Sequence, residues 1–249
     1  MRLHLVVLVG CVAVLGLAQG GLGSIVVDGQ LGDWGVTPFA DWQPDWPAWY
    51  TEENWGDHPG ESGAYPNGGE VFDQEALYAR IDNDVLYMAI VTSMPEAGYY
   101  ARGRQIMPGD LAMDFDGDGV YEFGIVGYGS DKGQVYFEPA WSLPDGDVGF
   151  PSQGPSTLSG GTYLDTIPFL YADAGVLEAD ATHTYILEMS IPMALLGNPD
   201  GTIRLHHVMT CGNDALDGEI EVQNVPEPAT VGVMMLGTVL TVASRRRGR

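Results

Sequence analysis

Residues 110–126 read DLAMDFDGDGVYEFGIV and predict a β-hairpin around which the rest of the fold is organised. Apolar and polar side chains alternate along both arms, as they do in strands. One face should carry Leu111, Met113, Phe115, Tyr121, Phe123 and Ile125, and the other Asp110, Ala112, Asp114, Asp116 and Glu122. Residues 116–119, Asp-Gly-Asp-Gly, tolerate the positive φ angles of a tight turn. The hairpin is therefore expected to have a core face and an acidic face in solvent.

The strands expected on either side of this hairpin are short and numerous. They cover residues 75–82, 84–93, 134–138, 182–191, 204–210 and 219–223, with a further short strand near residue 25. Residues 85–91 are apolar on both faces, which predicts a central strand covered on both sides. Residues 34–55 and 143–166 follow no regular period and are expected to be loops. One helical turn is expected at 192–196.

Composition favours an all-β fold. The chain has 35 glycines and 16 prolines in 249 residues, and both destabilise helix interiors, proline by about 3 kcal/mol. Since no long amphipathic helix pattern occurs, we predict an antiparallel β-sandwich of immunoglobulin-like or jelly-roll type over residues 24–223. The formal net charge of -24 argues against nucleic acid and anionic lipid as partners.

Both ends of the chain carry features of an exported protein. Residues 1–20 have a basic residue, Arg2, near their start and continue as an apolar run, the pattern of a signal peptide. The tail, residues 225–249, consists of Pro226, Glu227 and Pro228, an apolar run over 229–244, and Arg245, Arg246 and Arg247. As a transmembrane helix the run would be about 24 Å long, slightly less than a bilayer core of about 30 Å. The arginines would stay cytoplasmic, so the body would be held outside the inner membrane for a time.

This tail resembles the PEP-CTERM sorting signal of Gram-negative, biofilm-forming bacteria. The resemblance implies processing near the Pro-Glu-Pro by an exosortase-type membrane transpeptidase. It also implies delivery to the cell surface or to the extracellular polysaccharide matrix. The recognition residues would be Pro226, Glu227, Pro228, Arg245, Arg246 and Arg247.

The body resembles the β-sandwiches related to family 9 carbohydrate-binding modules and DOMON domains. The resemblance rests on Ile25-Val-Val-Asp-Gly with Asp33-Trp34, on Leu86-Tyr87-Met-Ala-Ile-Val, and on residues 185–196 with Ile191-Pro192. It implies a sandwich over most of residues 24–223 and a sugar ligand. No tryptophan matches a ligand-binding position, so sugar binding follows from the implied fold alone.

Residues 114–119 resemble the start of a calcium loop. Asp114, Asp116 and Asp118 followed by Gly119 form the pattern D-x-D-x-D-G, and Ca²⁺ takes about six to eight oxygen ligands, which closely spaced carboxylates supply. Glu122 stands at the ninth position, but the twelfth, where an EF-hand has its bidentate glutamate, is apolar. Calcium is thus the one cofactor predicted. The alternative is that these acids form the solvated face and turn of the hairpin.

Tryptophans gather in residues 34–55. Trp42, Trp46 and Trp49 are the candidates for a carbohydrate-binding platform, because aromatic faces stack on the apolar faces of sugar rings. The alternative is that they close an open end of the sandwich.

No catalytic constellation stands out. The motifs G-x-S-x-G and H-E-x-x-H are absent from the sequence, and among 34 acidic residues some pair will meet glycosidase spacing by chance. We therefore predict a non-catalytic exported protein, structural or associated with polysaccharide. Two alternatives stay open: a secreted carbohydrate-active hydrolase, and a sorting substrate with no ligand of its own.

Overall fold

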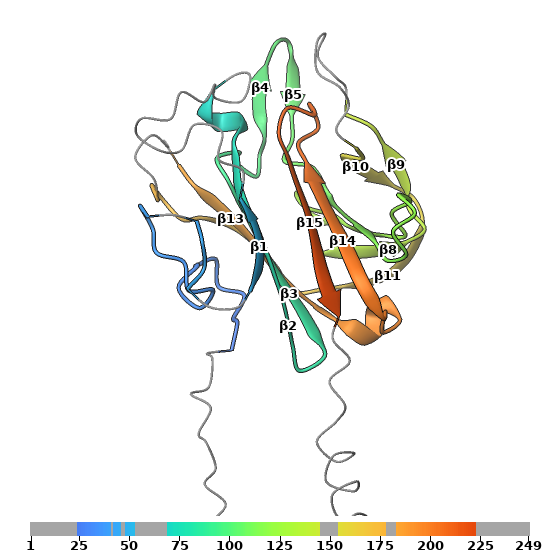
Figure 1. Ribbon diagram of the computed structural model, residues 1–249. Coiled ribbons are helices and arrows are strands. Elements are labelled where there is room, and N and C mark those ends of the chain that lie inside the picture. Colours follow the sequence, from blue (N-terminus) through green and yellow to red (C-terminus); the bar gives the residue numbers. More distant parts are fainter. Residues whose placement is uncertain are drawn as a thin grey trace, which may run out of the picture.

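The computed structural model describes residues 24–40, 42–45, 48–52, 69–144, 154–177 and 183–222. These residues form strands and two short 3-10 helices, which confirms the all-β class and the antiparallel sheets. Two large sheets lie face to face (Figure 1). The predicted signal peptide and sorting helix fall outside the described residues. Within them, no helix is long and apolar enough to span a membrane.

The first sheet has five strands in the order β1-β2-β3-β13-β12. They are β1 (Trp49–Glu52), β2 (Gln74–Asp82), β3 (Val85–Thr92), β12 (Phe169–Asp173) and β13 (Tyr185–Pro192). β3 is central, as its two apolar faces predict. The turn before it has Asn83 and Asp84 at φ 50° and 61°, the left-handed pair that a two-residue hairpin loop requires. β13 runs directly into η2 (Met193–Leu196), which is the predicted helical turn.

The second sheet has six strands in the order β11-β8-β7-β6-β14-β15. They are β6 (Leu111–Asp114), β7 (Phe123–Ile125), β8 (Gln134–Phe137), β11 (Thr162–Thr166), β14 (Gly201–Val208) and β15 (Ala215–Val222). The predicted hairpin forms its two middle strands, with Leu111 opposite Ile125 and Met113 opposite Phe123. These four side chains are buried in the core between the sheets, so the predicted core face is confirmed for them.

The two sheets approach closely at one edge. Trp49 of β1 packs against Gly218 of β15, where an added Cβ would lie only 1.7 Å from the indole ring. Glycine is the residue that leaves room for this ring, so the Trp49 side chain connects the two sheets.

The outer face of the first sheet is covered by the N-terminal segment. Ile25, Leu31, Trp34, Val36 and Trp42 pack there against β2, β3 and β13 and form a second apolar core. No strand forms near residue 25, contrary to expectation. The Asp33 carboxylate instead accepts a hydrogen bond from the Val26 N–H at 2.6 Å, and this local bond replaces a strand partner.

The outer face of the second sheet is covered by a ribbon of β9 (Ala140–Ser142) and β10 (Thr157–Ser159). Trp141 and Leu158 lie over Gly124, where a Cβ would come within 2.8 Å and 2.4 Å of them. The expectation that the polar face of the hairpin lies in solvent is therefore wrong in part, because Asp110 and Asp114 are only 3% and 1% exposed. An alternation pattern does not reveal which distant segment will cover a face.

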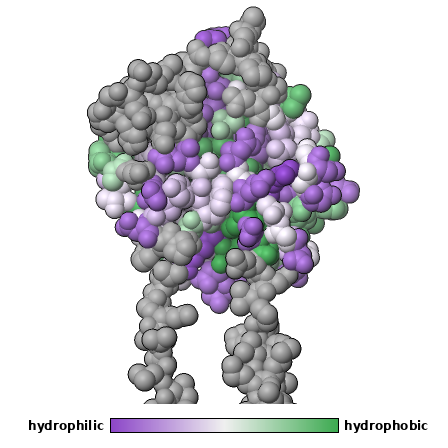
Figure 2. Space-filling view, viewed as in Figure 1, coloured by the Kyte–Doolittle hydropathy of each residue, from purple (hydrophilic) through white to green (hydrophobic). Residues whose placement is uncertain are grey.

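Several short elements escaped the sequence analysis. The expected loop over 143–166 contains β10 and β11, and the expected loop over 34–55 contains β1. The hairpin of β4 (Tyr99–Ala101) and β5 (Arg104–Ile106), at the top of Figure 1, and η1 (Glu70–Phe72) were not expected either. Segments of three to five residues are too short for a period to show. Figure 2 shows mainly polar residues over this face of the molecule and a hydrophobic patch near its lower end.

Candidate metal site

The candidate site lies in the turn between β6 and β7. Asp114 is the last residue of β6, and Gly117 and Gly119 have φ angles of 75° and 87°. These left-handed positions fold the chain back tightly and suit glycine. Asp116 and Asp118 are exposed, whereas Glu122 is half-buried beside the start of β7. The sequence Asp-Gly-Asp-Gly therefore lies in the reversal of the chain as expected, but within a connection over residues 115–122 that is longer than the predicted tight turn.

The turn is held by the carboxylate of Asp114. One oxygen, Oδ1, accepts hydrogen bonds from the N–H groups of Asp116 at 3.2 Å and Gly117 at 2.6 Å. The other, Oδ2, accepts from the Gly119 N–H at 3.0 Å. Glu122 closes the base of the turn, because its Oε2 accepts from the Phe115 N–H at 2.8 Å. Asp114 thus organises the loop from inside while Asp116 and Asp118 stay accessible.

The four predicted ligands converge on a small volume. Asp114, Asp116, Asp118 and Glu122 each offer a carboxylate oxygen, and these oxygens all lie within 4.8 Å of one another. Two oxygens bound to one Ca²⁺ at about 2.3–2.6 Å can be up to about 5 Å apart, so the four fit a shared ion. The twelfth position, Ile125, is a buried residue of β7. The arrangement therefore lacks the twelfth-position ligand of an EF-hand, and Glu122 at the ninth position supplies the fourth carboxylate of the cluster.

One cationic side chain borders the cluster. Arg204 of β14 stands opposite Asp114 in the sheet, and its Nη1 donates to the Gly117 carbonyl at 2.9 Å and lies 3.9 Å from Asp114 Oδ2. Its Nε donates to Glu219 at 2.8 Å. Among the described residues, this guanidinium contacts one of the four loop carboxylates and is shared with Glu219, so the loop keeps a negative charge that a divalent cation would offset.

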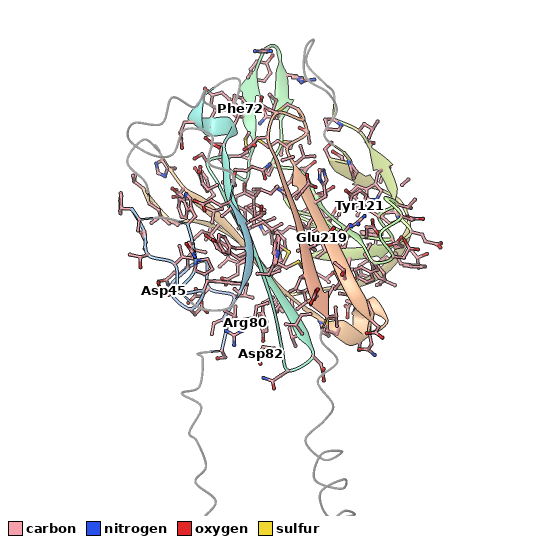
Figure 3. The ribbon with its side chains drawn as sticks, in the orientation of Figure 1. Asp45, Phe72, Arg80, Asp82, Tyr121 and Glu219 are labelled. Carbon is pink, nitrogen blue, oxygen red and sulfur yellow. The ribbon has the colours of Figure 1, made fainter. Side chains whose placement is uncertain are left out.

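Tyr121 departs from the predicted pattern. It was expected on the core face, but its ring lies against Trp141 and His206 on the outer face, with centroids 6.4 Å and 5.7 Å away (Figure 3). Residues 120–122 belong to no strand. The strand alternation therefore breaks before Phe123, and Tyr121 and Phe123 end on opposite faces.

The candidate tryptophans do not form one exposed surface within the described residues. Trp42 is 4% exposed, and its carbonyl accepts the Tyr78 hydroxyl at 2.6 Å. Trp49 is half-buried against Gly218. These placements favour the structural alternative for Trp42 and Trp49. Trp46 lies outside the described residues, so the sugar platform stays a prediction.

Sequence analysis missed a buried carboxylate on β13. Glu188 is 0% exposed and accepts three hydrogen bonds, from Trp34 Nε1 at 2.8 Å and from the N–H groups of Asp28 at 2.7 Å and Gly29 at 2.8 Å. Burial raises its pKa, against the hydrogen bonds that lower it. A glutamate that alternates with apolar residues suggests an exposed strand face. The N-terminal segment that buries Glu188 and donates hydrogen bonds to it is distant in the sequence.

The comparison with protein families concerns the tail. Residues 224–247 match the model of the PEP-CTERM protein-sorting motif. The PEP-CTERM motif implies an exported protein that is anchored transiently through its C-terminus and processed by an exosortase. Neither the curated proteins nor the solved structures gave a match. The six predicted recognition residues, Pro226 to Pro228 and Arg245 to Arg247, fall inside the matched segment but outside the described structure.

Proposed function

We propose that this chain is a non-catalytic protein of the cell surface or the extracellular polysaccharide matrix. The observation that carries the proposal is the PEP-CTERM motif at residues 224–247, behind a folded, strongly acidic β-protein. After processing, the body would be left outside the cell without its hydrophobic tail. There it would act as a structural or polysaccharide-associated component.

The body contributes to this role through calcium. The loop of residues 114–122 gathers four carboxylates, and a chain with a formal net charge of -24 would otherwise repel anionic polymers. Bound Ca²⁺ would lower this repulsion and stabilise the hairpin. It would also allow contacts with acidic polysaccharide through shared cations.

The buried carboxylates support a non-catalytic role. Asp114 and Glu188 each accept hydrogen bonds from N–H groups of turn or distant segments. Such bonds tie these groups to the framework, whereas a hydrolase needs two carboxyl groups facing a substrate cleft. The hydrolase alternative predicts turnover of a polysaccharide by the purified protein.

We also infer that the body is a sandwich of the type found in family 9 carbohydrate-binding modules and DOMON domains. Two of the sequence segments behind that resemblance, Asp28-Gly29 and Trp34, meet at Glu188. Their shared partner gives these residues a common structural role.

Calcium binding is expected to be saturable and to raise the melting temperature of the full chain in detergent. An ion that binds only the folded state stabilises it by about 2.7 kcal/mol at 100 times its dissociation constant. The paired variant Asp116→Ala and Asp118→Ala should lose both effects, because its exposed ligands are removed while Asp114 still holds the turn. Calorimetric titration followed by thermal melts measures both.

The control for this titration is Asp165→Ala, an exposed acid on β11. It should bind calcium like the unmodified protein. No heat of binding and no change in melting temperature would overturn the calcium proposal and leave these acids as a solvated turn.

A further inference from the structure

A second concave site lies on the outer face of the second sheet, apart from the acidic turn. It is a pocket of about 380 Å³ between β8, β10 and the loop over residues 126–131. Its polar and aromatic lining comes from Asp110, Tyr128, Asp131, Gln134, Tyr136 and Thr157. The volume falls at the small end of ligand pockets, about 300–1,000 Å³.

The walls of this pocket are fixed by a buried carboxylate. Asp110 Oδ1 accepts the Gly127 N–H at 2.9 Å, and Oδ2 accepts the Leu158 N–H at 2.7 Å. Gly127 begins the loop on one side and Leu158 belongs to β10 on the other. Asp110 therefore holds the two walls at a set distance, and the pocket exists before any ligand binds.

Two tyrosine rings line the pocket, and one of them is held by its neighbours. The Tyr136 hydroxyl donates to Gln134 Oε1 at 2.7 Å, and the rings of Tyr136 and Tyr163 pack edge to face, with centroids 5.8 Å apart. Tyr128 lines the pocket from the loop over residues 126–131. Both rings are half-buried, so each keeps part of its surface free for a ligand.

The charge of the lining restricts the ligand. Among the residues that the structure describes, the pocket is lined by Asp110 and Asp131 and by no lysine or arginine. Lys132, next in sequence, is paired with Glu96 at 2.7 Å. Carboxylates accept hydrogen bonds from hydroxyl groups, and the side-chain amide of Gln134 can accept from them and donate to them. An anionic ligand, in contrast, would meet uncompensated negative charge.

We propose that this pocket binds a neutral sugar unit of a polysaccharide, with Tyr136 stacked on the apolar face of the ring. Gln134, Asp131 and Thr157 hydrogen-bond its hydroxyls. The site rests on the proposed association with polysaccharide, and it is independent of calcium because it lies outside the 114–122 loop.

The test uses the full chain in a detergent without a sugar head group. Calorimetric titration is done with neutral trisaccharides (cellotriose, laminaritriose, maltotriose and mannotriose) and with the anionic trigalacturonate. At least one neutral sugar should bind saturably, equally well with and without a chelator. Tyr136→Ala should weaken that binding at least about tenfold, a loss of about 1.4 kcal/mol. Tyr136→Phe should keep most of it.

The matched control is Tyr100→Ala, which removes a 67% exposed ring from β4 and should bind like the unmodified protein. If Tyr136→Ala does not fold, Gln134→Ala serves as the second pocket variant and should also weaken binding. Binding to none of the four neutral sugars, tighter binding of trigalacturonate, or full binding by a folded pocket variant would overturn the site. Calcium-dependent retention on matrix would then still stand, so the two proposals fail separately.

Discussion

Glu188→Ala is expected to lower the free energy of unfolding by about 3–5 kcal/mol, because several N–H donors lose their acceptor and each buried donor left unsatisfied costs about 1–3 kcal/mol. The substitution would leave two buried donors, Trp34 Nε1 and the Gly29 N–H, and the part-buried Asp28 N–H without their acceptor. Those donors belong to the segment that covers the outer face of the first sheet. Removal of the Glu188 carboxylate should therefore loosen the packing of this segment on the first sheet as well as destabilise β13.

Urea unfolding followed by tryptophan fluorescence measures this effect. The free energy of unfolding of Glu188→Gln should lie between those of Glu188→Ala and the unmodified protein. The single carbonyl oxygen of glutamine can accept hydrogen bonds either from the backbone N–H groups or from the indole N–H. The control is Glu221→Ala, an exposed glutamate of β15, which should change stability by less than about 0.5 kcal/mol. A loss below about 1 kcal/mol for Glu188→Ala would contradict the assigned role.

His207→Gln is expected to remove much of the loss of stability that the protein suffers on acidification below about pH 6.5. His207 of β14 is 1% exposed, and its Nδ1 contacts Gln74 Oε1 on the facing sheet. Burial first, and then the neighbouring His206, lowers the pKa of His207 from 6.5 to about 3. The folded state thus stays unprotonated where the unfolded chain takes up a proton.

The sign follows from that difference. The stabilising contribution of His207 is complete above pH 6.5 and is lost as pH falls toward 3, by about 1.4 kcal/mol per pH unit. Asp33, Asp110 and Glu188 have raised pKa values, mainly through burial, and contribute the opposite slope. The unmodified protein and His207→Gln share this contribution to the pH dependence of stability, so it cancels in the difference between their stability curves.

Urea unfolding of the unmodified protein and of His207→Gln between about pH 4 and 8 measures the contribution of His207 to the pH dependence of stability. Above pH 6.5 the two stability curves should run parallel, and below it the unmodified protein should lose stability faster. Parallel curves over the whole range would show that His207 accepts a proton in the folded state.

The sequence predicted well what local patterns determine. The alternation in residues 110–126 correctly assigned Leu111, Met113, Phe123 and Ile125 to the core, because strand periodicity is a property of the chain itself. The acid spacing likewise brought together Asp114, Asp116, Asp118 and Glu122, since all four lie within one turn.

What the sequence did not reveal depends on contacts between distant segments. Glu188 and Asp110 looked like solvent-facing acids and are buried by segments about 160 and 48 residues away. The pocket lined by Tyr128 and Tyr136 joins β8 to β10 across a stretch that looked like a loop. The alternation pattern of one strand does not show which distant segment packs over its face. Burial by such a segment is what gives these carboxylates their structural role.

The most direct test is the intact mass of the protein that a chelator releases from washed extracellular matrix of the native host. We predict a chain without residues 1–20 and without the apolar run over 229–244, released with a calcium chelator and retained in buffer alone. An uncut chain found in the membrane, or a processed chain whose retention does not change with chelator, would contradict the account.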